Sequence, residues 1–320
     1  MSWLRDEERG GLNGWLEAGL FVFAISTLTV VYAVAQHAGA HMVVFILYAM
    51  GFAALGMLLI SGLGERPVAV ALARASLVFG FSTVLLEAFY FLLLAIMTPA
   101  ETSLSLRLSV PVSIVIGWLF FERGVSRQIW FGSLIITLAA LPVVLGVKAG
   151  DVIAAVLLAG LCSIFVAVKT FASEFNSANR AARGVVGKLR VTGLVVLSTT
   201  LIGAAVVMPL VALKEVGVSG LPAFLPAVSE FWKPATLITA IVLGAPVFVA
   251  MTYLTFSSVV KIGTESFLAT SAFTPFAVLA IEGIAVSAGL LRQEAFDWGL
   301  LPYIAVGIVG VLIVVRARHR

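Results

Sequence analysis

The sequence predicts an all-α polytopic membrane protein that crosses the bilayer ten times. Apolar residues make up 61% of its 320 residues and charged residues 11%, whereas roughly a quarter of the residues of a soluble domain are charged. The apolar residues are grouped into runs of about 20, the length that a helix needs to span the hydrocarbon core. A chain of this composition is predicted to fold in lipid rather than in water.

The ten runs lie between glycines, prolines and clusters of charge. The expected spans are 14–36, 42–62, 70–97, 99–121, 128–147, 152–171, 190–213, 236–260, 264–290 and 300–315. No small-residue cleavage site follows the charged segment that precedes the first span, so we interpret this span as an uncleaved helix. The connection 171–189 is either a basic interfacial helix or a solvated linker, and 215–233 is expected to lie at the membrane interface.

Basic residues concentrate in alternate connections. If the amino terminus is cytoplasmic, the cytoplasmic ends carry Arg5, Arg9, Arg66, Arg74, Arg123, Arg127, Lys169, Arg180, Arg183, Lys188, Arg190, Lys261, Arg316, Arg318 and Arg320. The outer ends then carry Lys148, Lys214, Lys233 and Arg292. This asymmetry follows the positive-inside rule, so we expect both termini in the cytoplasm and a bacterial inner (plasma) membrane as the location. The net charge of +4 therefore reflects topology, and no nucleic-acid partner is expected.

The two halves of the chain resemble each other at an offset of 164 positions. Three features coincide at this offset: the segments Ala100–Leu104 and Thr264–Leu268, the prolines Pro111 and Pro275, and the glycines Gly80 and Gly244. Each half, 14–147 and 152–315, holds five expected spans. Because five is odd, the second half must enter the membrane from the opposite side, which predicts two inverted repeats and alternating access between them.

A stretch of the fourth span carries a family resemblance. It consists of Pro111, the run Trp118, Leu119, Phe120 and Phe121, then Glu122 and Arg123, followed by Ser126, Trp130 and Gly132. This stretch resembles the EamA-like repeat of the drug/metabolite transporter (DMT) superfamily. The segments 266–275 and 299–315 fit the second copy, although the turn 292–297 follows a ninth span that is longer than the fourth. The resemblance implies a ten-helix transporter of metabolites such as amino acids, amines, drugs or nucleotide sugars.

Three ionisable residues, Glu87, Arg107 and Glu282, fall inside expected spans. A charge near the bilayer centre costs at least about 2.5 to 3.5 kcal/mol and rarely persists without a partner or a wet cavity. Glu87 and Arg107 flank the hairpin at Thr98 at depths that differ by roughly 3 Å, which predicts an ion pair. This pair either locks two helices together or is opened by a substrate or a proton.

One face of the fourth span is expected to line a central cavity. At the repeat offset Arg107, Pro111 and Trp118 match Ser271, Pro275 and Glu282. We expect Glu87, Arg107, Glu282, Tyr90, Trp118 and Ser271 to bind substrate, with the two aromatic rings offering cation–π contacts to an amine. Core packing explains either ring equally well. Pro111 and Pro275 each remove a backbone hydrogen bond, so we interpret them as helix hinges that shape the cavity.

Other polar residues have a simpler interpretation. Glu101 and Glu265 lie in the first turn of a helix, where a carboxylate caps free backbone amides. The single cysteine, Cys162, excludes an intrachain disulfide. His37 and His41 have a metal-like spacing but no acidic or cysteine ligand nearby in the sequence, so neither a metal nor a cofactor is expected.

These features predict a secondary active transporter, not an enzyme. No phosphate-binding glycine-rich loop with a lysine is present, so the energy is expected to come from H+, another coupling ion or substrate exchange. Charges of both signs favour a small polar metabolite of the amino acid or amine type. A lipid flippase or scramblase of the same fold is the alternative, and a membrane-embedded enzyme is less favoured because no grouping of serine, histidine and carboxylate is apparent. A monomer and a homodimer are both compatible with the sequence.

Overall fold

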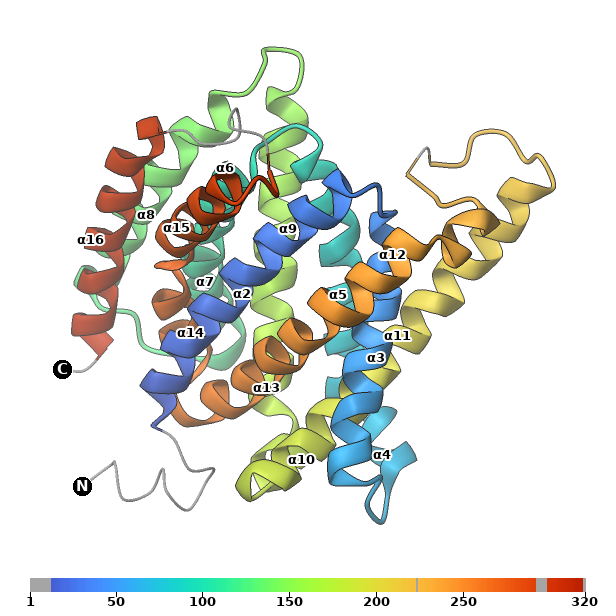
Figure 1. The fold of residues 1–320 in the computed structure, drawn as a ribbon. Helices are drawn as coiled ribbons and strands as arrows, with labels where there is room; N and C mark the ends of the chain where they lie inside the picture. The colour runs from blue at the N-terminus through green and yellow to red at the C-terminus, as the bar shows by residue number, and fades with distance from the viewer. Residues whose placement is uncertain (1–12, 223, 292–297, 319–320) are drawn as a thin grey trace.

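The computed structural model describes residues 13–222, 224–291 and 298–318, and within these ranges it is helical and contains no strand (Figure 1). Ten helical units are long and apolar enough to cross a membrane. The prediction of an all-α integral membrane protein with ten spans is therefore confirmed. The basic segment at the amino terminus and the turn 292–297, on which part of the sequence argument rests, lie outside the described residues.

The ten spans follow one another with short connections. The first five are α2 (Gly14–His37), α3 (Met42–Ser61), α5 (Arg74–Leu94), α6, η1 and α7 (Pro99–Ser105, Leu106–Leu108, Ser109–Phe121), and α8 (Arg127–Leu145). The last five are α9 (Val152–Phe175), α11 (Gly184–Glu215), α12, η3 and α13 (Pro234–Thr239, Ala240–Gly244, Ala245–Ile262), α14 and α15 (Thr264–Ser271, Thr274–Ser287), and η5 with α16 (Trp298–Leu300, Leu301–Arg318). The connections contain α4 (Pro67–Ala71), α10 (Ser177–Ala181) and η2 (Val228–Trp232).

The fourth and ninth spans are both broken near their middle. In the fourth, the 3-10 turn η1 separates α6 from α7, and in the ninth α14 ends at Ser271 before α15 begins at Thr274. Pro111 and Pro275 lie in the first turn after each break. Proline is tolerated there because its missing N–H would have no partner in the preceding turn. The prolines thus lie directly after the breaks.

The helices pack in pairs that combine the first five spans with the last five. Helix α8 packs along α16, α3 along α11, α5 along α9 and α2 along α13. In Figure 1, α8 and α16 form one edge of the bundle and α3 and α11 the opposite edge, with the remaining spans between them. Below, the lower end means the end that carries α4 and α10 in Figure 1, and the upper end is the opposite one.

Two glycines that correspond at the repeat offset allow close helix contacts. A Cβ atom on Gly80 of α5 would lie 2.8 Å from the Ile202 side chain of α11. A Cβ atom on Gly244 would lie 2.8 Å from Cβ of Ala49 in α3. Both distances are shorter than van der Waals contact, so a larger residue would force the Ile202 side chain to move at the first position and the helices to separate at the second.

The segment 171–189 is more ordered than either sequence interpretation proposed. Helix α9 continues to Phe175, α10 follows, and α11 begins at Gly184. The Lys188 ammonium group is buried and donates hydrogen bonds to the Asn179 carbonyl at 2.5 Å and to Asn179 Oδ1 at 3.0 Å. Asn179 also donates a hydrogen bond to the Phe256 carbonyl of α13, so part of the segment packs against the bundle, whereas Arg180 and Arg183 are exposed.

Candidate functional site

A central cavity of about 100 Å³ lies between the two sets of spans. Its walls come from α2, α5 and the broken fourth span of the first set, and from α9, α13 and the broken ninth span of the second. The charged side chains that line it are Glu87, Arg107 and Lys169. Three ionisable groups in one apolar bundle require a function or a balance of charge, and we take this cavity as the candidate site.

Arg107 joins the two broken helices across the cavity. It is 7% exposed, and its Nε donates a hydrogen bond to the Ser103 carbonyl at 3.0 Å. Its Nη1 donates to Ser271 Oγ at 3.0 Å and also to the Ser271 carbonyl. A guanidinium group has five N–H donors. The N–H groups of Nη2 have no hydrogen-bond partner among the described residues, so they are available to an anionic ligand.

The expected ion pair between Glu87 and Arg107 is not formed. Glu87 Oε2 instead accepts a hydrogen bond of 3.3 Å from the Tyr32 hydroxyl of α2. The 3-10 turn η1 carries Arg107 and changes the phase of the fourth span, which directs the guanidinium group to the oxygens of Ser271. The two side chains still line the same cavity, so a ligand can contact both.

Lys169 is the cavity residue that the sequence analysis missed. The expected sixth span ends at residue 171, and Lys169 counts among the basic residues expected at the cytoplasmic ends. Helix α9 runs to Phe175, so Lys169 lies within the span, lines the cavity and is close enough to attract the Glu87 carboxylate. The available signal was the pair Phe171 and Phe175, which are four residues apart and so share one face of a continuing helix.

The remaining expected binding residues divide into two groups. Tyr90 and Ser271 line the cavity as expected. Trp118 does not, because it is 52% exposed and its ring packs edge-on against Trp130 with centroids 6.2 Å apart. The helical phase used to place Trp118 on the face of Arg107 is interrupted by η1, which is why this prediction is wrong.

Pro111 and Glu282 line other hollows of the bundle. Pro111 lies in a groove of about 1410 Å³ between α5, α7 and α9, whose wall is mostly apolar. Glu282 lies in a pocket of about 430 Å³ at the upper end, beside Gln36, His37 and Pro99. Neither residue contacts the central cavity, so the single cavity face expected from the repeat offset is not formed.

Ion pairs hold the lower end of the bundle together around Arg123. One guanidinium nitrogen lies 2.6 Å from Glu174 of α9, and the other pairs with Glu265 of α14. The guanidinium carbon also lies 5.3 Å from the centroid of the Phe171 ring, a cation–π distance. Glu265 is therefore an ion-pair partner of Arg123, and it lies in the first turn of α14 as the sequence suggested. Glu101 does cap its helix, since its carboxylate accepts from Thr98 N at 2.7 Å.

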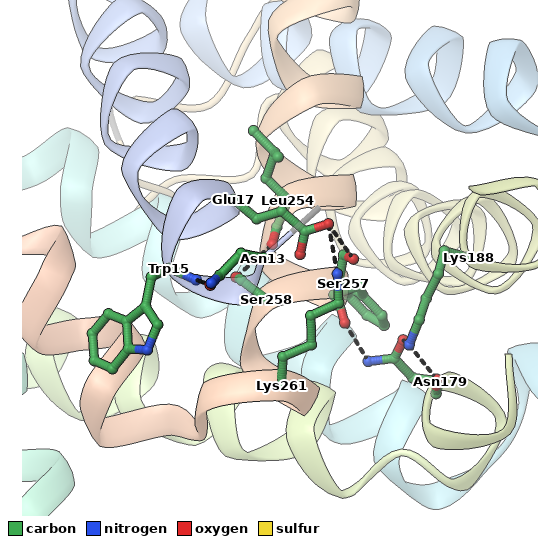
Figure 2. Close-up of polar contacts among 10 residues, drawn as sticks. Asn13, Trp15, Glu17, Asn179, Lys188, Leu254, Ser257, Ser258 and Lys261 are labelled. Atoms are coloured by element: carbon green, nitrogen blue, oxygen red, sulfur yellow. Dashed lines mark hydrogen bonds and ion pairs between the residues drawn. The ribbon is translucent and has the colours of Figure 1, made fainter. Parts of the chain in front are cut away.

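A second ion pair at the lower end was not expected (Figure 2). Glu17 of α2 is 2.9 Å from the Lys261 ammonium group of α13 and accepts a hydrogen bond of 2.8 Å from Ser257. The Glu17 and Lys261 side chains are 0% and 1% exposed. Figure 2 shows Lys188 and Asn179 beside this pair. The sequence analysis assigned Lys261 to membrane topology alone and left Glu17 without a role.

No group of three or more histidine, cysteine or acidic side chains that could hold a metal ion is found among the described residues. His41 lies between α2 and α3, outside the spans. Burial lowers the pKa of His41; Glu230 opposes this change, whereas Lys214 and Lys233 add to it.

Comparison with known proteins adds information on the fold. No family model and no curated protein matches the sequence. By structure, 26 chains match. One of them, described as "Crystal structure of protein", superposes with a TM-score of 0.56 over 95% of this chain and 99% of its own, with 20% identity. This likeness shows the fold alone.

Two pairs of residues that are separated by the repeat offset of 164 positions line the cavity. Arg107 corresponds to Ser271 and Glu87 to Met251, and all four residues line the cavity. Both charges of these pairs thus come from the first five spans, while their counterparts are neutral. Arg107 and Ser271 also contact each other directly.

Proposed function

We propose that this protein is a secondary active transporter that moves a small polar metabolite across the membrane by alternating access. The observation that carries the proposal is a cavity between the two sets of five spans, lined by the buried or partly buried charges of Glu87, Arg107 and Lys169. Such charges in the interior of a membrane protein mark a pathway for ions or polar substrates far more often than a structural role.

The arrangement of the helices supports two inverted repeats, 14–147 and 152–315. Exchanging the first and last five spans maps α3 against α11 and α8 against α16 onto themselves, and it maps the α5–α9 contact onto the α13–α2 contact. Gly80 and Gly244 make equivalent close contacts. With five spans in each repeat, we infer opposite orientations of the repeats and both termini in the cytoplasm.

The charges of the cavity favour a substrate that carries a carboxylate. Arg107 and Lys169 supply two cations, and Glu87 supplies one anion. An amino acid places its carboxylate at the cations and its amine at Glu87. A simple amine would gain only the Glu87 contact and would be repelled by two neighbouring cations. An amino acid type of substrate therefore fits better than an amine.

The cavity has to open for transport. Its volume of about 100 Å³ is smaller than the roughly 300 Å³ at which ligand pockets usually begin. At the lower end the Arg123 ion pairs connect the loop after α7 to α9 and α14. We infer that these ion pairs close the cytoplasmic gate, and that they separate when the transporter opens inward.

Membership in the DMT superfamily, a location in a bacterial inner membrane and the absence of enzymatic activity belong to the same proposal. Their support is the stretch from Pro111 to Arg123, the distribution of basic residues, and a bundle of ten apolar helices.

Uptake into proteoliposomes tests this proposal. Labelled amino acids and amines are offered to the wild type and to the Glu87→Gln and Arg107→Ala variants. We expect saturable amino acid uptake by the wild type and at least a tenfold loss in each variant, because a hydrogen bond to a charged group is worth about 1.5 to 3 kcal/mol.

Trp118→Phe serves as the control, since Trp118 faces away from the cavity. Its uptake should equal that of the wild type. Unchanged uptake by both charge variants, at equal amounts of folded protein, would contradict the proposal.

A lipid flippase is the second candidate, and the groove between α5, α7 and α9 favours it. The groove is about 1410 Å³, mostly apolar, and has Arg74 at its rim, as a lipid with an anionic headgroup would require. In vesicles with fluorescent phospholipids, dithionite would then quench both leaflets. Quenching of one leaflet alone would exclude this candidate.

A further inference from the structure

Glu282 differs from the other buried carboxylates of the described chain. Glu17, Glu174 and Glu265 are each buried and each contact a lysine or arginine side chain. Glu282 is 0% exposed, and neither of its carboxylate oxygens has a hydrogen-bond partner among the described residues. A buried carboxyl group without a partner is unfavourable whether it is ionised or neutral. The chain therefore supplies a counter-cation for every buried carboxylate that the structure describes except this one.

The surroundings of Glu282 are suited to a cation. The residue lies in the wall of the upper pocket, whose exposed rim includes Gln36 and His37 and whose volume is about 430 Å³. The Glu101 carboxylate on α6 is near enough to repel a negative charge on Glu282. Helix α2 ends at His37, and the carbonyl groups at a helix carboxyl end attract positive charge. The Glu282 carboxylate and the carboxyl end of α2 thus line one hollow, and the Glu101 carboxylate acts on Glu282 from beside it.

The pocket is distinct from the central cavity. The two hollows share no lining residue. The titratable side chains that face Glu282 are His37 from α2 and Glu101 from α6, and the described part of α16 brings none to the pocket. A substrate held by Arg107 and Lys169 therefore does not neutralise Glu282.

We propose that Glu282 forms a second binding site, at which a cation from solution, either a proton or a monovalent metal ion, neutralises the buried carboxylate. The existence of the site does not depend on the proposed transport function. Its role, which is to couple transport to a cation gradient, does rest on that function. Helix α15 carries Glu282 and begins next to Ser271, the residue that binds Arg107. Occupation of the pocket is thus connected to the substrate cavity through the broken ninth span.

Dicyclohexylcarbodiimide, which reacts with carboxyl groups in apolar surroundings, tests the site on purified protein without any transport substrate. Peptide mass spectrometry measures the labelling of Glu282 while pH is varied at constant salt, and while sodium replaces choline at constant pH. If the cation is a metal ion, labelling falls at least severalfold with sodium. If it is a proton, labelling falls as pH rises and does not respond to sodium.

The Glu282→Gln variant should lose this labelled peptide, and Glu65→Gln, a change in the exposed α3–α4 connection, should keep it. A wild-type protein that is not labelled at Glu282 under any condition would overturn the proposal. Labelling that responds to neither pH nor sodium would also overturn it. Because the wild-type measurement requires no variant and no substrate, it is independent of the folding of Glu282→Gln and of the uptake experiment.

Discussion

At the scale of single residues, the binding capacity of the central cavity depends on charged side chains whose hydrogen-bond partners are neutral groups. Arg107 uses serine oxygens and not a carboxylate, and Glu87 uses a tyrosine hydroxyl. These neutral partners satisfy hydrogen bonds but leave the formal charges in place. A ligand can therefore still gain electrostatic attraction from both residues, although Lys169 already attracts the Glu87 carboxylate.

Lys169 is expected to bind the substrate carboxylate together with Arg107. Lys169→Gln removes the charge and keeps a polar side chain, so KM for amino acid uptake should rise about tenfold or more, in line with the loss of one charged hydrogen bond. Lys169→Arg should retain most of the affinity. A Lys169→Gln variant with the KM of the wild type would show that the carboxylate binds elsewhere.

At the scale of helices, boundaries and breaks decide what the sequence could reveal. The ten spans were predictable because lipid requires long apolar helices with their backbone hydrogen bonds satisfied internally. The phase of a broken helix was not predictable. The 3-10 turn η1 turned Trp118 away from the cavity and directed Arg107 toward the ninth span. Helix α9 continues beyond residue 171, the expected end of the sixth span, so Lys169 lies in the cavity wall and not at the cytoplasmic end of the span.

The ion pairs of the lower end were hidden for a different reason. Glu17 and Lys261 lie in the first and eighth spans, far apart in the sequence, so only the packing of α2 against α13 brings them together. Basic residues near helix ends also satisfy the positive-inside rule. That explanation accounted for Lys261 and Arg123 without requiring any partner, and so their pairing remained unseen.

Close contact between α8 and α16 makes a specific prediction about glycine. A Cβ atom on Gly132 would lie 2.7 Å from the Gly310 carbonyl oxygen and 2.7 Å from the Val314 side chain. Gly132→Ala should therefore destabilise the protein by about 1 to 3 kcal/mol, the usual cost of overpacking, and lower its Tm in detergent.

Gly56→Ala is the matched control, because nothing lies within 4 Å of a Cβ atom at this position. There the higher helix propensity of alanine should leave the Tm unchanged or raise it. Equal Tm values for the two variants would show that the α8–α16 contact is looser than described.

At the scale of the whole molecule, two sets of ion pairs close one end of the bundle while the pocket of Glu282 opens at the other. Arg123 connects three elements of the lower end, and the Glu17–Lys261 pair connects α2 to α13. In the alternating-access cycle that we propose, these pairs separate when this end opens. The equilibrium between conformations then depends on interactions that only one of them contains.

Arg123→Gln should shift this equilibrium toward the form that is open at the lower end. In a Cys162→Ser background, a cysteine introduced at Ser109, which lines the cavity, reports its access to a membrane-impermeant maleimide in inside-out vesicles. Labelling should increase severalfold with Arg123→Gln. Arg127→Gln is the control, because Arg127 lies at the end of the same connection and has no ion pair among the described residues. Its labelling should equal that of the unchanged protein. Equal labelling of the Arg123→Gln and Arg127→Gln variants would contradict the proposed gate.

The unequal contribution of the two halves of the chain to the cavity has an energetic consequence for the transporter that we propose. If its two halves were identical inverted copies, the conformations that face either side of the bilayer would be related by a twofold rotation and equally populated. Glu87 and Arg107 correspond to Met251 and Ser271 at the repeat offset. The two conformations are therefore not equivalent, and their free energies differ. In the proposed transporter, we therefore expect the resting population of each conformation to depend on the positions at which the two halves differ.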